Sequence, residues 1–178
     1  VTIERSEFAR NGYGDGYTHN LYVNGVDLLH VSDSWFREAR IGHQVKSRAR
    51  ETRLERNYLM DGPAGTSSYL VDTPDGGVVT LRGNLMHKGP RADNAIAVAF
   101  GAEGLKWTDN RLTMVHNTLV MTRNGGTYVN VAAGTAAVTL RANLFAGTGS
   151  VQLLTGISAS RVTSEDHVDG SAFRLPGA

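Results

Sequence analysis

Residues 79–87 read VTLRGNLMH, and residues 138–145 read VTLRANLF. In both stretches apolar residues alternate with polar ones, and an asparagine and a further apolar pair follow. Alternation with a period of two residues predicts a half-buried β-strand. Four further stretches keep the same pattern: VTIERSEF (1–8), LLHVSDSWF (28–36), TRLERNYLM (52–60) and LTMVHNTLV (112–120). One strand pattern that returns along the chain predicts a repeat architecture.

The spacing of these stretches gives the length of one repeat. The polar residues at the shared position are Ser6, Ser34, Asn57, Asn84, Asn117 and Asn143. By subtraction they lie 28, 23, 27, 33 and 26 positions apart. This is the length of a solenoid coil and is too short for a full helix in every repeat, because a βαβ unit needs about 30 residues or more. Asparagines stacked at one coil position would hydrogen-bond to one another and satisfy the backbone of the turn.

A second predicted strand follows each stretch after a turn that carries glycine or asparagine. These strands are NLYVN (20–24), QVKSR (44–48), SYLVD (68–72), AIAVAF (95–100), TYVNVA (127–132) and VQLLT (151–155). Two or more short strands per repeat, with 21 glycines in the chain, predict an all-β parallel β-helix of about six coils. We expect it to be right-handed, because β–crossover–β connections almost always are. An antiparallel β-sandwich is the alternative, but it does not require the recurring register.

Composition bounds the domain and its partners. The 178 residues suit a single domain over 1–178, and a hydrophobic content of 40% is enough for a core. A net charge of only +1 argues against a nucleic-acid partner, and no apolar run of 18 residues is present that would span a membrane. The chain has no cysteine, so neither a disulfide nor a thiolate site is expected.

The two ends of the chain carry their own predictions. The sequence begins at Val1, in mid-pattern and without a methionine. We therefore expect the C-terminal part of a longer solenoid whose export signal has been removed, and predict a secreted or periplasmic protein. An uncapped first coil would expose strand edges, which predicts self-association through the solenoid ends. Residues 157–178 are predicted to form a terminal tail or cap.

The stretch GHQVKSRA (42–49) gives the main functional signal. Lys46 and Arg48 lie two positions apart in a predicted strand, so both side chains should project from the same face. Residues 37–56 contain seven basic and three acidic residues, which is a local charge of +4 in a chain whose total is +1. Two cations at the centre of this basic excess predict a site for an anionic ligand.

An alignment of the second strands of the first three coils predicts what surrounds these cations. In it Asn20, Tyr22 and Asn24 fall beside Gln44, Lys46 and Arg48, and then beside Ser68, Leu70 and Asp72. Neighbouring coils lie about 4.8 Å apart. The register therefore predicts an outward cluster of Tyr22, Lys46, Arg48 and Asp72. His19 and His43 hold equivalent positions before their strands, and we expect them to stack at the edge of this cluster.

Five stretches of the chain are distinctive as motifs: GYGDGYTHNLYVNG (12–25), ARIGHQVKSRA (39–49), SYLVDTPDGG (68–77), GAEG (101–104) and LTMVHNTLV (112–120). Together they resemble a bacterial family of right-handed parallel β-helix repeat proteins, which is similar to pectate lyases and other polysaccharide-active β-helices. The terminal HVDGSAFRLPGA (167–178) resembles the closing motif common in such secreted proteins. The resemblance implies the fold and leaves the activity open, because β-helices host lyases, hydrolases, epimerases and non-catalytic adhesins.

The strand VKS (45–47) is similar to a motif of β-helix alginate and chondroitin lyases, whose lysine is the base. By this resemblance Lys46 would be the base, and an arginine about one coil later would neutralise the uronate. The next strand, SYLVD (68–72), contains no arginine, so Arg48 would have to supply that cation.

An acidic polysaccharide is therefore the predicted partner, and β-elimination at a uronate is the predicted reaction. Elimination needs a cation on the uronate carboxylate, a base for the C5 proton and an acid for the leaving oxygen. We predict that Arg48 neutralises the carboxylate and that Lys46 is the base, with a pKa lowered by its basic surroundings. Tyr22 or His43 would be the acid. An epimerase would use the same groups and return the proton to the opposite face.

Further residues are predicted to bind the substrate, namely His19, Asn24, Gln44 and Asp72. No cofactor is expected, apart from a Ca²⁺ ion that Asp72, Asp75 or Asp61 could hold through carboxylate oxygens. Glu103 lies in the GAEG loop of the longest repeat, where a loop could wall a groove.

Each of these assignments has a structural alternative. Lys46 and Arg48 could form an exposed ion-pair ladder with Asp72 on neighbouring coils. His19 and His43 could be turn residues that bond the backbone. Under this interpretation the chain is a non-catalytic β-helix, either structural or a glycan-binding or adhesion module.

Overall fold

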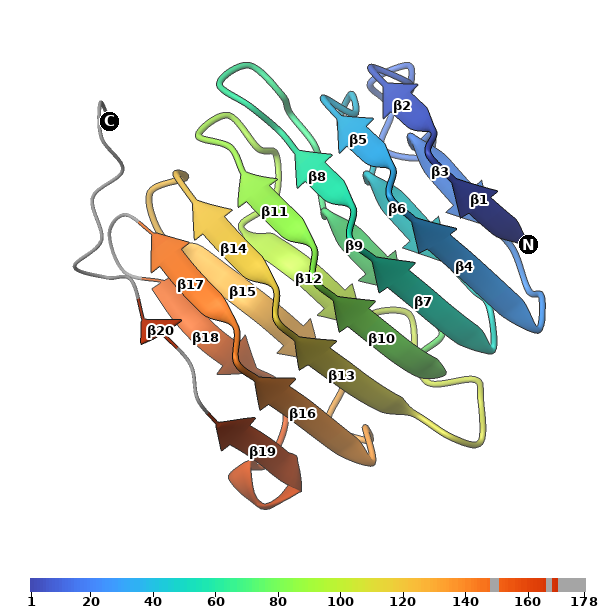
Figure 1. The fold of residues 1–178 in the computed structure, drawn as a ribbon, viewed down its shortest axis with the longest axis vertical. Helices are drawn as coiled ribbons and strands as arrows, with labels where there is room; N and C mark the ends of the chain where they lie inside the picture. Colours follow the sequence, from blue (N-terminus) through green and yellow to red (C-terminus); the bar gives the residue numbers. More distant parts are fainter. Residues whose placement is uncertain (148–150, 166–167, 170–178) are drawn as a thin grey trace.

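The computed structural model of the protein describes residues 1–147, 151–165 and 168–169. These residues wind into a solenoid in which three sheets run side by side along the molecule (Figure 1). Throughout the described ranges each paired strand lies parallel to its neighbour in the sheet. The predicted all-β parallel β-helix of about six coils is thus confirmed, and the antiparallel sandwich is excluded.

Each coil contributes one strand to each of the three sheets. Sheet A contains β1 (Thr2–Glu4), β4 (Leu28–Ser32), β7 (Glu51–Glu55), β10 (Val78–Arg82), β13 (Arg111–Val115), β16 (Ala137–Arg141) and β19 (Val162–Glu165). Sheet B contains β2 (Glu7–Ala9), β5 (Trp35–Arg37), β8 (Tyr58–Met60), β11 (Leu85–Lys88), β14 (Thr118–Met121), β17 (Leu144–Gly147) and β20 (Val168–Asp169). Sheet C contains β3 (Leu21–Val23), β6 (Val45–Ser47), β9 (Val71–Thr73), β12 (Ile96–Phe100), β15 (Gly126–Val131) and β18 (Val151–Thr155). Coil 1 is therefore β1–β3, and the following coils are counted in the same way.

The repeated sequence stretch folds into two strands that meet at a bend. Residues 79–87, for example, supply most of β10 and β11, with Gly83 and Asn84 between them. The residue just before the shared polar position has a positive φ in all six coils, from 47° to 64°: Arg5, Asp33, Arg56, Gly83, His116 and Ala142. This left-handed conformation turns the chain from sheet A to sheet B. Glycine adopts it freely, and other residues incur a steric cost because of their Cβ atom.

The predicted asparagine ladder lies on the inner side of this bend. The Nδ2 atoms of Asn57, Asn84 and Asn117 donate to the Oδ1 atom of the next asparagine at 3.1, 2.9 and 2.9 Å, ending at Asn143. The same Oδ1 atoms accept the backbone N–H of the preceding asparagine, at 2.9 to 3.0 Å. The ladder asparagines are only 1–2% exposed, so these bonds satisfy polar groups that water does not reach.

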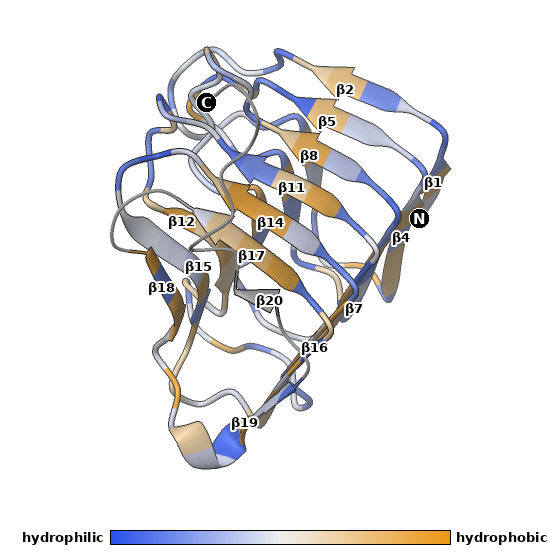
Figure 2. Ribbon diagram, turned by 60° about the vertical axis from the view of Figure 1, so that its left-hand side comes forward, coloured by the Kyte–Doolittle hydropathy of each residue, from blue (hydrophilic) through white to orange (hydrophobic). Residues whose placement is uncertain are grey.

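Apolar side chains from the three sheets fill the space inside the coils. Val79, Leu81 and Met86 of one repeat are 0–1% exposed, as are their counterparts in neighbouring repeats. Figure 2 shows that hydrophobic residues gather along sheet B and hydrophilic ones in the turns. The alternation in the sequence therefore turns every second residue of a strand into the core, where apolar residues stack from coil to coil.

A buried polar network closes the loop between β8 and β9. Lys88 and Asp61 are fully buried, with Nζ 3.8 Å from Oδ2. Nζ donates to the carbonyl oxygen of Ser67 at 2.9 Å and to that of Ser68. Asp61 Oδ1 accepts bonds from Ser67 Oγ at 2.5 Å and from Gln44 Nε2 at 3.0 Å. Burial lowers the pKa of Lys88 to about 8, because the charged form loses its hydration.

The ends of the solenoid differ from each other. Strands β1, β2 and β3 are the first in their sheets, and among the described residues no strand pairs with their outer edges. Self-association through these edges stays a prediction. Of the predicted tail, residues 159–161 form a short 3₁₀ helix, η1 (Ala159–Arg161), and β19 and β20 begin a further coil. The remainder, 166–167 and 170–178, lies outside the described residues. Within the described ranges, no helix has the length and apolar character that crossing a bilayer requires.

Candidate functional site

Lys46 and Arg48 project from the outer face of sheet C, as their spacing predicts. Val45 and Ser47, the alternate residues of β6, are fully buried. Parallel pairing of β3 with β6 sets Tyr22 directly beside Lys46. The outer face of coils 1 and 2 therefore presents one phenol and two cations to the solvent.

The third coil is shifted by two residues from the predicted register. Lys46 pairs with Asp72 in the sheet, not with Leu70, because Val45 lies opposite Val71. The shift preserves the alternation, so Asp72 still belongs to the cluster, but it lies beside Lys46 and not beside Arg48. Lys46 Nζ is 3.4 Å from Asp72 Oδ2. Residue spacing predicts the face of a strand, whereas the register depends on the length and path of the loop that precedes it.

A carboxylate from a distant loop bridges the two cations. Glu103 follows β12 of coil 4, and its Oε1 accepts a hydrogen bond from Lys46 Nζ at 2.9 Å. Its Oε2 accepts one from Arg48 Nη2 at 2.5 Å. Gly101 and Gly104 flank the Glu103 turn with φ values of 74° and 100°, which lets the loop fold back towards coil 2. Glu103 thus holds a carboxylate between a lysine and an arginine.

Arg48 has further partners on both sides. Its Nη1 donates to Asp75 Oδ1 at 2.6 Å, and its Nε donates to the phenol oxygen of Tyr22 at 3.0 Å. The guanidinium carbon lies 6.0 Å from the centre of the Tyr22 ring. Fixed between a carboxylate and a phenol, Arg48 has a defined orientation towards the pocket.

His19 and His43 stack as the sequence predicts. Their ring centres are 4.5 Å apart with an interplanar angle of 9°, and Tyr69 continues the stack on the far side of His43 at 4.8 Å. Each Nδ1 accepts a backbone N–H of the next coil: His19 from His43 at 3.0 Å, and His43 from Tyr69 at 3.1 Å. Because an acceptor nitrogen carries no proton, the hydrogen of each neutral ring lies on Nε2.

The stacked histidines lead to a buried carboxylate. His43 Nε2 is 3.3 Å from Asp72 Oδ2, and the Asp72 side chain is 3% exposed. Asp72 Oδ1 is also buried and has no hydrogen-bond partner. Both ring nitrogens of His43 are engaged within the protein. His43 therefore orients Asp72, and its geometry leaves no nitrogen free for the acid role that the sequence predicted.

The pKa values of the buried groups follow from their burial. Desolvation lowers the pKa of His43 to about 3 and that of His19 to about 4, so both rings are neutral at pH 7. Desolvation raises the pKa of Asp72 to about 6, against the opposing charge of Lys46. Hydrogen bonds from Lys46 and Arg48 lower the pKa of Glu103 to about 2. Glu103 is therefore fully ionised at neutral pH.

The predicted lowering of the pKa of Lys46 is wrong. Burial does act to lower it, but the hydrogen bond to Glu103 and the negative charge of Asp72 raise it above its ordinary value. The basic neighbours of Lys46 are close in sequence, whereas the carboxylate that outweighs them folds back from coil 4. Lys46 is thus a firmly held cation, which suits charge neutralisation better than proton abstraction.

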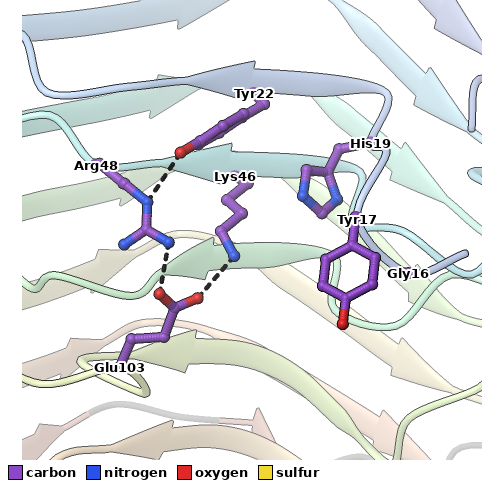
Figure 3. Close-up of a pocket in the computed structure, with 7 residues that line it drawn as sticks. All are labelled: Gly16, Tyr17, His19, Tyr22, Lys46, Arg48 and Glu103. Carbon is purple, nitrogen blue, oxygen red and sulfur yellow. Dashed lines mark hydrogen bonds and ion pairs between the residues drawn. The ribbon is translucent and has the colours of Figure 1, made fainter.

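A pocket of about 440 Å³ opens above this cluster. Its lining residues are Gly16, Tyr17, His19, Tyr22, Lys46, Arg48 and Glu103. In Figure 3 Arg48 and Tyr22 lie on one side of the pocket, His19 and Tyr17 on the other, and Lys46 between them. This volume falls in the range of small-ligand sites in proteins.

Three residues predicted to bind substrate do not line the pocket, namely Asp72, which is buried, Gln44 and Asn24. The sequence predicts Gln44 as a substrate-binding residue, but Gln44 is fully buried and bonds to Asn20 and Asp61. It precedes β6 and lies at the corner between sheets B and C, where strand alternation no longer holds. Asn24 is exposed, but it follows β3 and its side chain accepts the Gly25 N–H at 2.9 Å. It does not line the pocket.

The carboxylates considered for Ca²⁺ are separated and paired with cations. Asp61 is near Lys88 in the buried network, Asp72 near Lys46, and Asp75 bonds Arg48 and Lys106. Over the residues that the structure describes, no group of three or more His, Cys, Asp or Glu side chains is placed to hold a metal ion.

Two side chains of the pocket, those of Glu103 and Tyr17, are not predicted as ligand contacts by the sequence. Glu103 lies 57 residues from Lys46, and its sequence signals are the two glycines around it and its place in the longest repeat. Tyr17 lies in the glycine-rich stretch 12–25, a motif to which the sequence assigns no role of its own. Comparison of the chain with protein-family models, with curated proteins and with solved structures gives no match. The interpretation of the site therefore depends on its own geometry.

Proposed function

We propose that the protein binds an acidic, uronate-containing polysaccharide at this pocket and cleaves it by β-elimination. The observation that carries the proposal is the Glu103 carboxylate, which bridges Lys46 Nζ and Arg48 Nη2 at 2.9 and 2.5 Å. The two cations are thus spaced to receive a carboxylate. A uronate carboxylate would take this place when the exposed Glu103 side chain moves aside, because charge-assisted bonds of the same kind form to either carboxylate. The pectate-lyase-like resemblance of the motifs agrees with such a substrate.

Charge neutralisation is the first requirement of the reaction. Lys46 and Arg48 would hold the uronate carboxylate and stabilise the negative charge that develops there when C5 loses its proton. Asp72 lies 3.4 Å from Lys46 Nζ and keeps the ammonium group in place. Asp72 is in turn held by His43 at 3.3 Å. Asp72 and His43 would thus act as positioning residues for Lys46.

Tyr22 is the residue best placed to transfer the proton. Its phenol oxygen accepts a bond from Arg48 Nε at 3.0 Å, which orients that oxygen beside the two cations. As phenolate, Tyr22 would take the C5 proton while the C4–O bond breaks and a C4–C5 double bond forms. The resulting phenol would then return the proton to the leaving oxygen, which balances the step. His19 is neutral and has Nε2–H available as a donor to a sugar hydroxyl.

A polymer of this kind does not cross a cell envelope. The proposal therefore includes action outside the cytoplasm, as a secreted or periplasmic protein.

The test is a screen of alginate, pectate, hyaluronan, chondroitin and glucuronan for the near-ultraviolet absorbance of the unsaturated product. We expect one of these polymers to give product with the native chain, and Lys46→Met, Arg48→Gln and Tyr22→Phe each to reduce the rate by about 10² or more. Arg111→Gln is the matched control, because Arg111 is an exposed arginine paired with Asp109 on sheet A. Equal rates in Tyr22→Phe and the native chain would overturn the proton-transfer assignment.

A non-catalytic glycan-binding module is the second candidate. It is favoured by the fact that Lys46 and Arg48 already have carboxylate partners within the chain, as in a structural ion-pair array. Calorimetric binding of a polymer without any product, and without exchange of its C5 proton for deuterium, would establish this candidate. Deuterium exchange without an unsaturated product would identify an epimerase that uses the same groups.

A further inference from the structure

The loop between β2 and β3 displays two tyrosines to the solvent. Tyr13 is 92% exposed and Tyr17 is 86% exposed, the highest values among the large hydrophobic residues of the described chain. A tyrosine ring has an apolar face and a polar hydroxyl, so an exposed ring at the edge of a pocket can contact both the apolar and the polar groups of a ligand. The loop carries both rings in a stretch of five residues, GYGDGYT being the surrounding sequence.

The backbone of this loop is tied down, so the exposure of the rings does not come from a loose segment. Asp15 Oδ1 accepts the N–H groups of Tyr17 and Thr18 at 2.9 and 3.0 Å, and Thr18 Oγ1 donates to it at 2.8 Å. The Tyr13 N–H donates to Thr18 Oγ1 at 2.8 Å. At Gly42 a Cβ atom would lie 1.8 Å from the carbonyl oxygen of Thr18, so the loop packs directly on the turn of coil 2.

Tyr17 belongs to the same pocket as the two cations. It lines the cavity together with Lys46, Arg48 and Glu103. Figure 3 shows its ring beside His19, on the side of the pocket opposite Arg48 and Tyr22. An anion held between the cations would thus have an exposed aromatic ring next to it, at the pocket edge.

We propose that Tyr17 forms a sugar-ring subsite, against which the pyranose next to the cation-bound uronate stacks through its apolar C–H face. The proposal rests on the proposed function, and it narrows the ligand to an oligosaccharide of at least two residues. A free uronic acid or another small carboxylate fills the cation pair alone and leaves Tyr17 uncovered. An aromatic platform beside a carboxylate receptor matches a polymer whose rings are apolar on their faces and acidic at one substituent.

The experiment measures binding by the native chain of uronate mono-, di- and tetrasaccharides, from alginate, pectate and glucuronan, by isothermal titration. We expect affinity to rise at least tenfold between the monosaccharide and the disaccharide. Tyr17→Ala should lower the affinity for the disaccharide about tenfold and leave the affinity for the monosaccharide unchanged. Tyr17→Phe should retain the native values, since the ring and not the hydroxyl makes the contact. Tyr58→Ala is the matched control, because Tyr58 is 54% exposed on sheet B and outside the pocket.

The outcomes separate this inference from the function on which it rests. Disaccharide binding that Lys46→Met abolishes and Tyr17→Ala leaves unchanged would retain the acidic-glycan site and overturn the subsite. Equal affinity for mono- and disaccharide would overturn it as well. Absence of binding for all uronate ligands would overturn the proposed function, and the subsite with it. Shifts of the Tyr17 ring protons on titration with disaccharide, absent with monosaccharide, would support the stacking independently of any activity.

Discussion

Glu103 Oε1 lies 2.9 Å from Lys46 Nζ, although one residue belongs to a loop after coil 4 and the other to a strand of coil 2. The contact closes a charge network on the outer face of sheet C, since Glu103 also binds Arg48 and Lys46 also approaches Asp72. The Glu103 side chain is 46% exposed, whereas those of Lys46 and Arg48 are 12% and 16% exposed. The movable member of the network is therefore the carboxylate, and an anionic ligand competes with it.

Glu103→Gln should strengthen the binding of acidic oligosaccharides. The neutral amide makes weaker contacts with the two cations, so a uronate carboxylate displaces it more easily, and we expect an affinity gain of about three- to tenfold. Titration with a uronate disaccharide at fixed ionic strength measures it. Glu51→Gln, which removes the partner of Arg53 on sheet A, is the control and should leave binding unchanged. Weaker binding in Glu103→Gln would show that Glu103 contacts the ligand and does not compete with it.

The neutral His43 should make the fold sensitive to acid. Its pKa is about 3 in the folded chain and 6.5 for an unperturbed histidine, so the unfolded chain binds more protons between these values. The stability that His43 contributes is present above pH 6.5 and is lost as the pH falls towards 3, by about 2–3 kcal/mol at pH 4.5. Thermal melts from pH 7.5 to 4.5 should show a falling midpoint, and His43→Gln should flatten the slope. An unchanged slope in the variant would contradict the assignment.

Asp72 should change the stability of the fold with pH in the direction opposite to His43. Burial raises its pKa to about 6 from 3.8, so the folded chain takes up a proton before the unfolded chain does. As the pH falls from 6 to 3.8, this group alone favours folding. Asp72→Asn should therefore be relatively more stable above pH 6, where the native carboxylate is charged and buried, and should show a steeper loss of stability on acidification. Melting midpoints of the variant and of the native chain over the same pH series measure the difference.

Asn84→Ala should break the ladder at its centre. The substitution removes the Oδ1 acceptor of the Asn57 N–H and side-chain amide, and the donor to the carbonyl oxygen of Leu54. Each buried group left unpaired costs about 1–3 kcal/mol, so we expect a loss of about 3 kcal/mol in the free energy of unfolding. Urea denaturation tests this, with Asn24→Ala as the exposed control. A loss below about 1 kcal/mol would show that water replaces the amide.

Lys88→Met should strongly lower the free energy of unfolding, although Lys88 lies outside the pocket. The variant leaves Asp61 without its cation and removes the Lys88 Nζ donor from the carbonyl groups of Ser67 and Ser68. Removing one partner of a buried pair costs about 3–5 kcal/mol. Lys106→Met is the control, since Lys106 is 60% exposed and its bond to Asp75 contributes little. Comparable urea midpoints for the two variants would contradict a structural role for the network.

The sequence by itself determined the solenoid fold and the strand face from which Lys46 and Arg48 project. The recurring alternation around Ser34, Asn57 and Asn84 predicts stacked strands, because a period of two residues fixes which side chains enter the core. The same alternation places Lys46 and Arg48 on one outer face. These features are local, so they can be derived from residues a few positions apart.

The tertiary structure decided the register and the charge state of the site. The two-residue shift that sets Asp72 beside Lys46 depends on the path of the loop before β9, and no local pattern encodes it. The return of Glu103 from coil 4 reverses the expected effect on the pKa of Lys46. Such contacts join residues that are distant in the chain. Their energies depend on burial and on separations of a few ångströms, which only the folded coils supply.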